Sequence, residues 1–446
     1  MGSIEDIFRA YDIRGIYKQE ITLEFAEQIG LSFGTFLGNR GLVVMSRDAR
    51  HGGPYLQAAL TKGLNDAGVG TIEIGMVPTP TANYVTAEAG ATAGVVISAS
   101  HNPPEYNGIR FRKGDGSGYP ECIEAVREIY MNKSWSAPGG GKHVSKDTKK
   151  AIDGYLDYIA KRTKIKRKLK VVVDPGNGAA SGVAKRLFEK LGCSVSAIND
   201  FPDGNFPGRS AYPNEKTLSG LQSAVLGSHS DFGVAYDGDA DRAVFVDDKG
   251  QVKSAEEIGT ILVREILREN SGIVALNVDC SMSVEEAVKE AGGMVKRIRV
   301  GDVFLADAVK NGAIFAMESS SHFVIPRYFV FDDGIAASAY LAEILSRSKE
   351  KLSEICAKIP KYSVVRKTVE VPDYLKFKVI EKLAKMYAER KPLTIDGVKV
   401  NYSNGWTLVR VSNTQPMLRL TAEAKNGWEA EAMMTKLEEA VKKCLD

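Results

Sequence analysis

Short apolar runs rich in β-branched residues alternate with helical patterns along most of this 446-residue chain. Each run is closed by glycine or polar residues, as expected of strands that end in loops. The clearest runs are GLVVMSRD, GVVISASHN, KVVVDPGNG, FGVAYDGD, GIVALNVD and GAIFAMES. Amphipathic helices lie between them, and one begins with a capping box formed by Ser254 and Glu257. The alternation predicts βαβ units whose sheets are mostly parallel and buried.

The chain is too long for one hydrophobic core, and its length favours about three or four domains. A glycine-rich polar stretch, residues 135–147, indicates a linker or an exposed loop. After about Pro360 the pattern changes to strand, loop, strand and helix, which predicts a smaller α+β domain. We therefore predict an α/β fold of four domains. Their expected limits are residues 1–150, 151–252, 253–365 and 366–446.

Charge and cysteine usage exclude several classes of protein. The formal net charge of +3 argues against nucleic acid as the main partner. No apolar run approaches the roughly 20 residues of a membrane helix, and the first residues lack the apolar core of a signal peptide. The five cysteines are scattered without C-x-x-C pairs, which argues against structural zinc and a disulfide framework. We therefore expect a cytoplasmic protein with no membrane or nucleic-acid partner, and the sequence leaves its oligomeric state open.

Polar loops follow three of the predicted strands, and they form a weak repeat. These loops are SASHNP, DGDADR and ESSSH. Ligands of α/β proteins bind outside the carboxyl ends of the strands. Together with RVSNTQP near the C-terminus, the three loops could therefore face one cleft between four domains.

The loop DGDADR places Asp237, Asp239 and Asp241 at alternate positions directly after a predicted strand. Carboxylates this close repel one another unless a cation lies among them. Hard oxygen ligands select Mg²⁺ or Ca²⁺, and an EF-hand calcium loop needs glycine where this chain has Arg242. The loop therefore predicts a Mg²⁺ site, with a plain acidic surface turn as the alternative.

Ser100, in SASHNP, stands at the end of another predicted strand, next to His101. A serine hydroxyl is a weak nucleophile at neutral pH, and Ser100 lacks the G-x-S-x-G surroundings of a serine hydrolase. A serine that carries a phosphoryl group beside Mg²⁺ fits the acidic loop better, with Arg14 and Arg110 neutralising its charge. The alternative is that Ser100 only shapes a turn.

Two further loops offer groups that suit a phosphorylated sugar. ESSSH, residues 318–322, supplies a carboxylate, hydroxyls and an imidazole for sugar hydroxyls, and His322 is a possible acid–base group. RVSNTQPMLR supplies arginines, hydroxyls and turn amides for the oxygens of a phosphate monoester. Its candidate residues are Arg410, Ser412, Asn413, Thr414 and Arg419. A structural histidine and a polar hairpin with solvated arginines are the alternatives.

In order along the chain, FRAYDIRG, SASHNP, DGDADR, ESSSH and RVSNTQP resemble motifs of the α-D-phosphohexomutases. The resemblance covers essentially the full length. It implies three similar mixed α/β domains and a smaller C-terminal α+β domain around a central cleft. It also implies reversible phosphoryl transfer between C1 and C6 of hexose phosphates through a phosphoserine and Mg²⁺. A hexose 1,6-bisphosphate would be the intermediate, which turns round in the cleft, and would also serve as the activator.

The resemblance implies roles for individual residues. Ser100 would be the phosphoserine, and the catalytic residues would be Ser100, His101, Arg14, Arg110 and His322. The metal ligands would be Asp237, Asp239 and Asp241, with one oxygen of phosphorylated Ser100. The substrate-binding residues would be Tyr11, Arg242, Glu318, Ser320, His322, Arg410, Ser412, Asn413, Thr414 and Arg419.

Three positions depart from the family pattern. Arg110 stands where the family usually has lysine; arginine keeps the charge but is a poor proton donor or acceptor at neutral pH. We therefore expect Arg110 to hold phosphate, with proton transfer shifted to His322 or another group. Ser321 stands where glycine is common and could alter the loop shape, and Gln415 replaces a commoner glutamate.

The choice of sugar rests on few residues. FRAYDIRG and Asn413 favour phosphomannomutase/phosphoglucomutase members, which act on mannose and glucose phosphates. The alternative is a phosphoglucosamine mutase, whose members more often begin FGTxGIRG and carry glycine at the position of Asn413. A sugar-phosphate sensor without turnover and a Mg²⁺-dependent phosphatase are further alternatives. The intact Ser100 and the complete acidic loop argue against the sensor.

Overall fold

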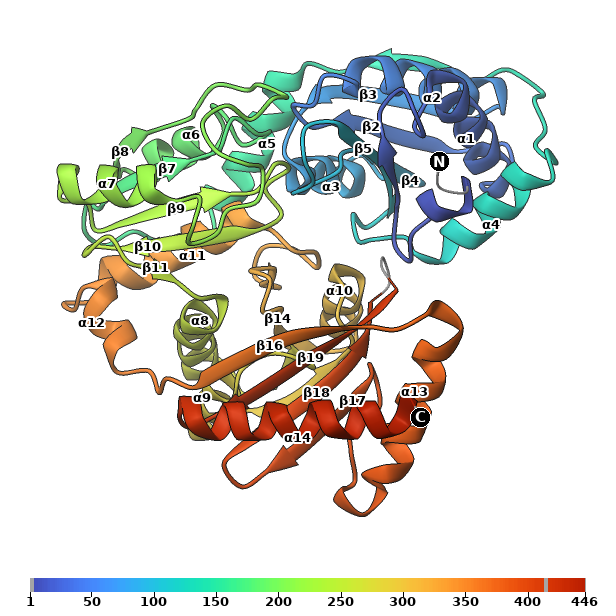
Figure 1. Cartoon of the computed structure of the whole chain (residues 1–446). Coiled ribbons are helices and arrows are strands. Elements are labelled where there is room, and N and C mark those ends of the chain that lie inside the picture. Colours follow the sequence, from blue (N-terminus) through green and yellow to red (C-terminus); the bar gives the residue numbers. More distant parts are fainter. Residues whose placement is uncertain (1–3, 413–415, 446) are drawn as a thin grey trace.

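The computed structural model describes residues 4–412 and 416–445, and these form four β-sheets in succession along the chain (Figure 1). We call the part built on each sheet the first to fourth domain. The first two domains form the upper part of the molecule in Figure 1, and the third and fourth lie below them. In the described residues, we find no helix that is both long and apolar enough to cross a membrane.

The first domain carries a six-stranded sheet. Its strands are, in spatial order, β1 (Ile13–Ile16), β5 (Tyr106–Lys113), β4 (Ala93–Ile97), β2 (Leu42–Arg47), β3 (Gly70–Met76) and β6 (His143–Ser145). Its helices are η1 (Ile4–Ile7), α1 (Leu23–Phe36), α2 (Gly53–Asp66), α3 (Thr79–Glu88) and α4 (Glu121–Met131). The stretch expected to be a linker thus contains β6, which pairs with β3 through backbone bonds while its own side chains stay exposed.

The second and third domains share one large hydrophobic core. The second sheet has the order β11 (Val252–Lys253), β10 (Ala243–Asp247), β9 (Phe232–Tyr236), β7 (Lys170–Asp174) and β8 (Ser194–Ala197). Its helices are α5 (Thr148–Ala160), α6 (Ala184–Lys190) and α7 (Ser219–Ser228).

The third sheet has the order β13 (Met294–Ile298), β12 (Ile273–Asn277), β14 (Ala313–Met317) and β15 (Phe323–Val324). Its helices are α8 (Ala255–Glu269), α9 (Met282–Glu290), α10 (Asp302–Lys310), α11 (Gly334–Arg347) and α12 (Leu352–Ala357).

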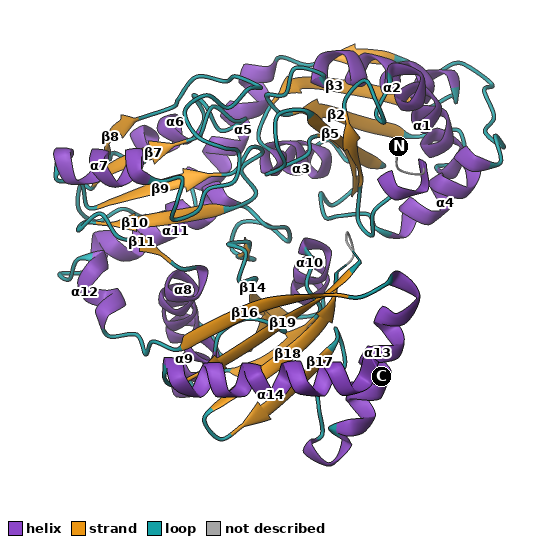
Figure 2. Cartoon of the chain, in the orientation of Figure 1, coloured by secondary structure: helices purple, strands orange, loops and turns teal. Residues whose placement is uncertain are grey.

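The fourth domain is an antiparallel sheet with helices beside it (Figure 2). Its strands are, in spatial order, β16 (Ser363–Glu370), β19 (Met417–Ala424), β18 (Gly405–Val411) and β17 (Val398–Tyr402). Its helical segments are α13 (Asp373–Met386), η2 (Ala388–Arg390) and α14 (Gly427–Leu445). This arrangement confirms the predicted strand, loop, strand and helix at the C-terminus.

The predicted strands and the predicted capping box are confirmed. The six apolar runs form β2, β4, β7, β9, β12 and β14. Ser254 and Glu257 make both bonds of the capping box at the start of α8. The exact domain limits stay a prediction, and α5, β11 and β16 run across residues 150, 252 and 365.

The same strand arrangement places one polar loop in each of the first three domains. Strands β4, β9 and β14 each have a parallel neighbour on one side and an antiparallel neighbour on the other. The antiparallel neighbour follows directly in the chain, so each polar loop is the turn of a hairpin at the carboxyl end of a parallel strand. SASHNP joins β4 to β5, DGDADR joins β9 to β10, and ESSSH joins β14 to β15. This topology accounts for the weak repeat in the sequence.

A buried polar contact joins the third and fourth domains. Lys399 of β17 donates a hydrogen bond from Nζ to the carbonyl of Val278, at 2.6 Å, and its ammonium lies 3.8 Å from the ring centre of Trp406. Glu423 of β19 accepts bonds from the amide of Met282, at 2.7 Å, and from Trp406 Nε1, at 3.3 Å. Burial, reinforced by Arg297, lowers the pKa of Lys399 to about 7.

The low pKa of Lys399 predicts a pH dependence of stability. Between pH 7 and the ordinary lysine pKa of 10.5, the unfolded chain holds a proton at this site that the folded chain has lost. The contribution of Lys399 to the free energy of unfolding should therefore rise with pH, by up to about 1.4 kcal/mol per pH unit. Lys399→Met should remove this rise in denaturant unfolding measured from pH 7 to 10. Lys425→Met, an exposed lysine of the same domain, is the control; an unchanged slope in Lys399→Met would contradict the prediction.

Candidate functional site

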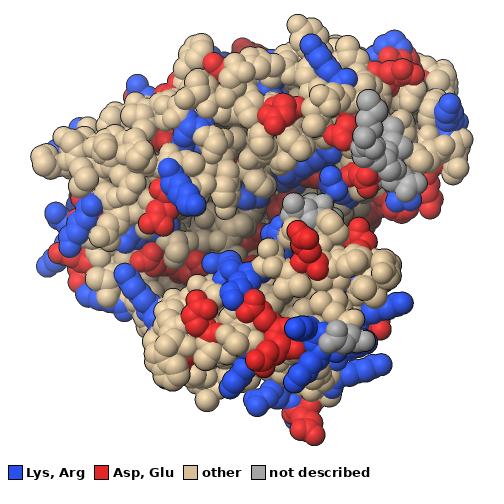
Figure 3. All heavy atoms as spheres, viewed as in Figure 1, with Lys and Arg blue, Asp and Glu red and all other residues tan. Residues whose placement is uncertain are grey.

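Loops of the first three domains meet around a cavity of about 240 Å³. The space-filling view shows a hollow between the upper and lower parts of the molecule, with lysine and arginine side chains beside it (Figure 3). Eight of the predicted site residues line the cavity: Tyr11, Arg14, Ser100, Arg110, Arg242, Glu318, Ser320 and His322. The structure therefore brings together residues that lie up to about three hundred positions apart in the chain.

Ser100 lies in the hairpin turn after β4 and faces the acidic loop of the second domain. Its hydroxyl donates to Asp237 Oδ2 at 2.9 Å and lies 3.2 Å from Nδ1 of His101. Its backbone has a φ of 49°, in the left-handed region that serine seldom adopts, and its amide donates to Ser98 Oγ at 2.8 Å. Backbone strain of this kind persists where the surroundings hold it and is common at functional sites.

Arg50 is fully buried and holds the Ser100 loop through its backbone carbonyls. Its guanidinium donates to the carbonyls of Ser100, at 2.9 Å, and Asn102, at 2.6 Å. It also donates to the carbonyls of Pro103 and Tyr106, while Nε donates to the carboxylate of Asp48 at 3.1 Å. One cation thus fixes the carbonyls of the turn, which leaves the Ser100 hydroxyl directed toward the acidic loop.

The three carboxylates of the acidic loop are buried, and their oxygens come within 4.8 Å of one another. Burial, followed by Asp241 and Asp239, raises the pKa of Asp237 well above its ordinary range. Burial would also raise the pKa of Asp241, but Arg110, His322 and Arg242 outweigh it and lower that pKa. Within the described residues, Oδ1 of Asp239 and Oδ1 of Asp241 find no hydrogen-bond donor. Buried carboxylate oxygens that lack donors fit a hard divalent cation such as Mg²⁺.

Arg110 of β5 joins three domains through one guanidinium. Its Nη1 lies 2.7 Å from Oδ2 of both Asp239 and Asp241, and its Nη2 lies 2.9 Å from Oδ2 of Asp302. The two arms of the fork bind different domains, which a lysine ammonium could not reproduce with the same geometry. Thr79 donates a further hydrogen bond to Asp239 Oδ2 at 2.7 Å. The departure from lysine at this position thus comes with a carboxylate partner in the third domain.

The two candidate histidines differ in charge: His101 is neutral and His322 is positively charged. Arg242, burial and Arg14 lower the pKa of His101 to about 2, so this ring is neutral. Burial and Arg242 would lower the pKa of His322, but Asp241 and Asp332 raise it to about 9. Nδ1 of His322 lies 2.5 Å from Asp332 Oδ2. His322 therefore carries positive charge toward the cavity, and His101 contacts Ser100 directly.

The predicted sugar loop is the turn between β14 and β15. The carboxylate of Glu318 accepts from the amide of Gly301 and, at 2.7 Å, from the hydroxyl of Ser320. Ser321, at the position where glycine is common, has a φ of 71°. A left-handed residue is what a glycine would supply, so this serine keeps the turn at some cost in backbone strain.

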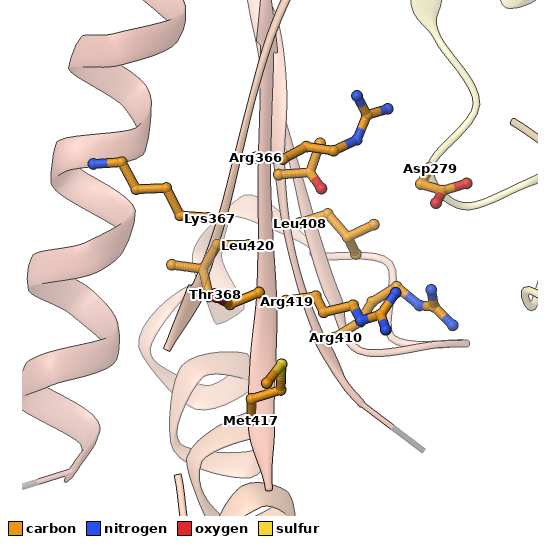
Figure 4. Close-up of a pocket in the computed structure, with 10 residues that line it drawn as sticks. Asp279, Arg366, Lys367, Thr368, Leu408, Arg410, Met417, Arg419 and Leu420 are labelled. Atoms are coloured by element: carbon orange, nitrogen blue, oxygen red, sulfur yellow. The ribbon is translucent and has the colours of Figure 1, made fainter. Parts of the chain in front are cut away.

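The fourth domain presents a basic pocket of about 370 Å³, drawn in Figure 4. Arg410 and Arg419 lie side by side on the neighbouring strands β18 and β19, and Arg366 of β16 lines the same pocket. Asp279 of the third domain lies across from these arginines. Ser412 is buried, and its amide donates to the carbonyl of Met417 at 3.0 Å. The predicted residues Asn413 and Thr414, and Gln415 beside them, lie outside the described residues.

Several residues of the site were not predicted from the sequence. These are Arg50, Thr79, Asp279, Asp302, Asp332 and Arg366. Arg50 follows the run GLVVMSRD, so polar residues at the end of that strand were a signal for it. The others lack a local motif, because each acts on a partner that only folding brings close.

The chain matches four protein-family models in succession. They describe phosphoglucomutase/phosphomannomutase α/β/α domain I over residues 5–136, domain II over residues 153–250 and domain III over residues 254–362. The fourth, the C-terminal domain of the same family, matches residues 367–440.

Individual relatives are similar along nearly their whole length. A protein of Methanopyrus kandleri described as a probable phosphoglucosamine mutase is 37% identical, with 98% of each chain covered. A phosphoglucomutase/phosphomannomutase of Thermococcus kodakarensis is 36% identical, with 98% of this chain and 99% of that protein covered. The crystal structure of a phosphoglucomutase/phosphomannomutase family protein of Burkholderia thailandensis has a TM-score of 0.90 at 30% identity. That alignment covers 100% of this chain and 98% of the other.

Arg50→Met should destabilise the protein strongly. The substitution leaves the buried Asp48 without its cation and leaves the turn carbonyls without donors. Breaking a buried ion pair on one side costs about 3–5 kcal/mol in free energy of unfolding, measurable by denaturant titration. The double variant Asp48→Asn/Arg50→Met should recover part of the loss. A loss below about 1 kcal/mol would show that Arg50 does not hold the loop.

Asp237→Asn should separate metal binding from folding. The amide can still accept from Ser100, and the change removes repulsion from Asp239 and Asp241, so metal-free stability should be equal or higher. Magnesium at 100 times its dissociation constant should stabilise the native chain by about 2.7 kcal/mol, and this gain should be lost in the variant. Thermal unfolding with Mg²⁺ and with a chelator measures both effects. Glu215→Gln, at an exposed position of the same domain, should keep the gain; the idea fails if Asp237→Asn keeps it too.

Proposed function

Because the chain belongs to the phosphoglucomutase/phosphomannomutase family of the α-D-phosphohexomutases, we propose that it transfers a phosphoryl group reversibly between C1 and C6 of a hexose phosphate. The family and the names of its relatives make the chain an isomerase-type enzyme. One observation carries the proposal. The hydroxyl of Ser100 lies against a buried cluster of three carboxylates, in a cavity bordered by the sugar loop.

Ser100 would be the residue that carries the phosphoryl group. In the forward step the bond between phosphorus and Ser100 Oγ breaks, and a new bond forms to the C1 or C6 hydroxyl oxygen of the sugar. The sugar hydroxyl loses its proton as the new bond forms, and the leaving Ser100 Oγ takes one up. His322 lines the cavity and is protonated at neutral pH, so it is suited to donate that proton. His101 contacts Ser100 Oγ through Nδ1 at 3.2 Å, but its pKa of about 2 makes it a poor proton carrier. Arg14 holds the turn through a hydrogen bond of 2.9 Å to Asn102 Oδ1.

Asp237, Asp239 and Asp241 would hold Mg²⁺. The ion would neutralise the oxygens of the transferring phosphoryl group, as in other phosphoryl-transfer sites. The fork of Arg110 adds fixed positive charge at the same place, and its contact with Asp302 keeps it there. The charge of the reacting group is thereby balanced by groups already in position, which lowers the cost of reorganisation.

The basic pocket would bind the phosphate that does not react. Arg410 and Arg419 offer guanidinium forks, and arginine binds phosphate oxygens with two parallel hydrogen bonds. Glu318 and Ser320 would read the sugar hydroxyls between the two ends. A hexose 1,6-bisphosphate could then turn round in the cleft, because the same arginines accept either phosphate.

For the sugar itself we propose glucosamine phosphate as the preferred substrate. The support is the relative from Methanopyrus kandleri described as a probable phosphoglucosamine mutase, which is similar over nearly the full length. This reverses the order expected from FRAYDIRG and Asn413. Glucose and mannose phosphates are the second candidate, because a relative of nearly equal identity is described as a phosphoglucomutase/phosphomannomutase.

A substrate panel tests the proposed function. Glucosamine 1-phosphate, glucose 1-phosphate and mannose 1-phosphate would each be supplied with Mg²⁺ and a trace of the matching 1,6-bisphosphate. We expect kcat/KM for glucosamine 1-phosphate to exceed the other two by about tenfold or more. Radiolabelled 1,6-bisphosphate should label the protein, and Ser100→Ala should lose both label and turnover. Ser134→Ala, at an exposed position of the first domain, should keep both.

Each other outcome selects another function. Faster turnover of glucose and mannose phosphates would select the second candidate and leave the mechanism intact. Release of free phosphate without a 6-phosphate product would identify a phosphatase. Labelled Ser100 with no turnover of any of the three sugars would refute mutase activity on them.

A further inference from the structure

Asp396 lies where the fourth domain meets the third, in the turn before β17. Its Oδ2 lies 2.8 Å from Arg410 Nη2 and accepts a hydrogen bond of 2.9 Å from the backbone amide of Val300. The Asp396 side chain is only 17% exposed and that of Arg410 only 14%, so water screens their ion pair incompletely. A single carboxylate oxygen therefore links an arginine of the phosphate pocket to the backbone of another domain.

The backbone around Asp396 has little freedom to move. Gly397 has a φ of 84°, and a Cβ at this position would overlap the carbonyl of Val409 and lie 3.0 Å from Cα of Arg410. Leu393 and Lys399 close the turn through two backbone hydrogen bonds of 2.9 Å. The turn is thus packed directly against the residue that its carboxylate binds.

Asp396 offsets the charge of Arg410 in a pocket where arginines outnumber carboxylates. Arg366 and Arg419 line the same pocket, and guanidinium groups in one pocket repel each other. Among the described residues, Arg410 Nε is buried without an acceptor. The carboxylate of Asp396 offsets the repulsion and fixes the orientation of the fork.

The segment Val300–Gly301 connects Asp396 to the Ser100 cavity. The carbonyl of Val300 accepts from the hydroxyl of Tyr11 in the first domain at 3.3 Å. The amide of Gly301 donates to the carboxylate of Glu318 in the sugar loop. Val300 and Gly301 also line the cavity. Two successive amides of one segment thus bind the two carboxylates that serve the phosphate pocket and the sugar loop.

We propose that Asp396 is a positioning residue for the hexose phosphate. Asp396 fixes the position of Arg410 relative to the Val300–Gly301 segment. This position sets the distance between the distal phosphate and the sugar contact at Glu318. Asp396 acts through Arg410 and Val300, and it does not itself bind the substrate. The inference rests on the proposed function, because it takes Arg410 as a ligand of the distal phosphate.

Calorimetric binding of hexose 6-phosphates to full-length Ser100→Ala tests this inference without turnover. In that background Asp396→Asn should weaken the binding of glucosamine 6-phosphate by about tenfold or more, as expected when a hydrogen bond to a charged group is lost. Glu439→Gln is the matched control, since Glu439 is an exposed carboxylate on α14 of the same domain. Asp396→Glu keeps the charge but shifts it by one methylene, and it should show an intermediate loss. Equal binding by Asp396→Asn and the control would overturn the proposal, as would undiminished binding by Asp396→Glu.

Amide hydrogen exchange supplies a second readout on the same variants. Asp396→Asn should speed the exchange of the Val300 amide, whose acceptor is changed, and also of Gly301, whose acceptor is Glu318. An unchanged exchange rate at the Gly301 amide would show that Asp396 does not influence the sugar loop, and it would overturn the proposed positioning role. If the Ser100→Ala parent binds none of glucosamine, glucose and mannose 6-phosphate, the proposed function fails instead. The exchange of Gly301 then still decides whether Asp396 orders this segment.

Discussion

Three buried carboxylates on one hairpin turn, Asp237, Asp239 and Asp241, constrain everything around them. Their mutual repulsion in a poorly solvated place must be offset by positive charge from elsewhere. Arg110 supplies part of it from the first domain, and through Asp302 it also binds the third. The need to neutralise one acidic turn thus draws three domains together around the hydroxyl of Ser100.

The arrangement of the first three domains shows how a common fold serves different chemistry. Each domain places a hairpin turn at the carboxyl end of a strand that is parallel to one neighbour and antiparallel to the next. The backbone of each turn is fixed by a different means. Arg50 caps the carbonyls of the Ser100 turn, whereas the turn between β14 and β15 is held by Glu318 and the left-handed Ser321. The side chains are therefore free to differ in role while the strands keep them in one place.

The fourth domain contributes charge of the opposite sign. Its antiparallel sheet aligns Arg410 with Arg419 on neighbouring strands, and an anion is the natural partner of such a pair. The structure therefore contains an acidic cluster, suited to a cation, and a separate basic pocket, suited to an anion. Asp396 and the Val300–Gly301 segment connect Arg410 of the basic pocket to Glu318 through an ion pair and backbone hydrogen bonds.

Much of the fold and the site could be predicted from local patterns. Apolar runs closed by polar residues located the six strands, and the spacing of DGDADR located the buried acidic turn. Both signals are local, because strand periodicity and charge repulsion act between residues close in sequence. The short strand β6 was missed, since its three residues are too few for a pattern and their side chains are exposed, while the backbone pairs with β3. The preferred sugar was ordered differently by the motifs than by the relatives, because few residues distinguish these substrates.

Local sequence patterns were enough to locate the strand-ending loops, the acidic triad, and Ser100 as a hydroxyl at the end of a strand. Which cations and carboxylates contact these groups became known only from the folded chain. Arg50 reaches the Ser100 turn from the loop after strand β2. Asp302 meets Arg110 across 192 positions of sequence, and Asp396 meets Val300 across 96. Such partners leave no trace in a local pattern. The partner of a charged side chain is the group that folding places within about 3 Å of it, which need not be close in sequence.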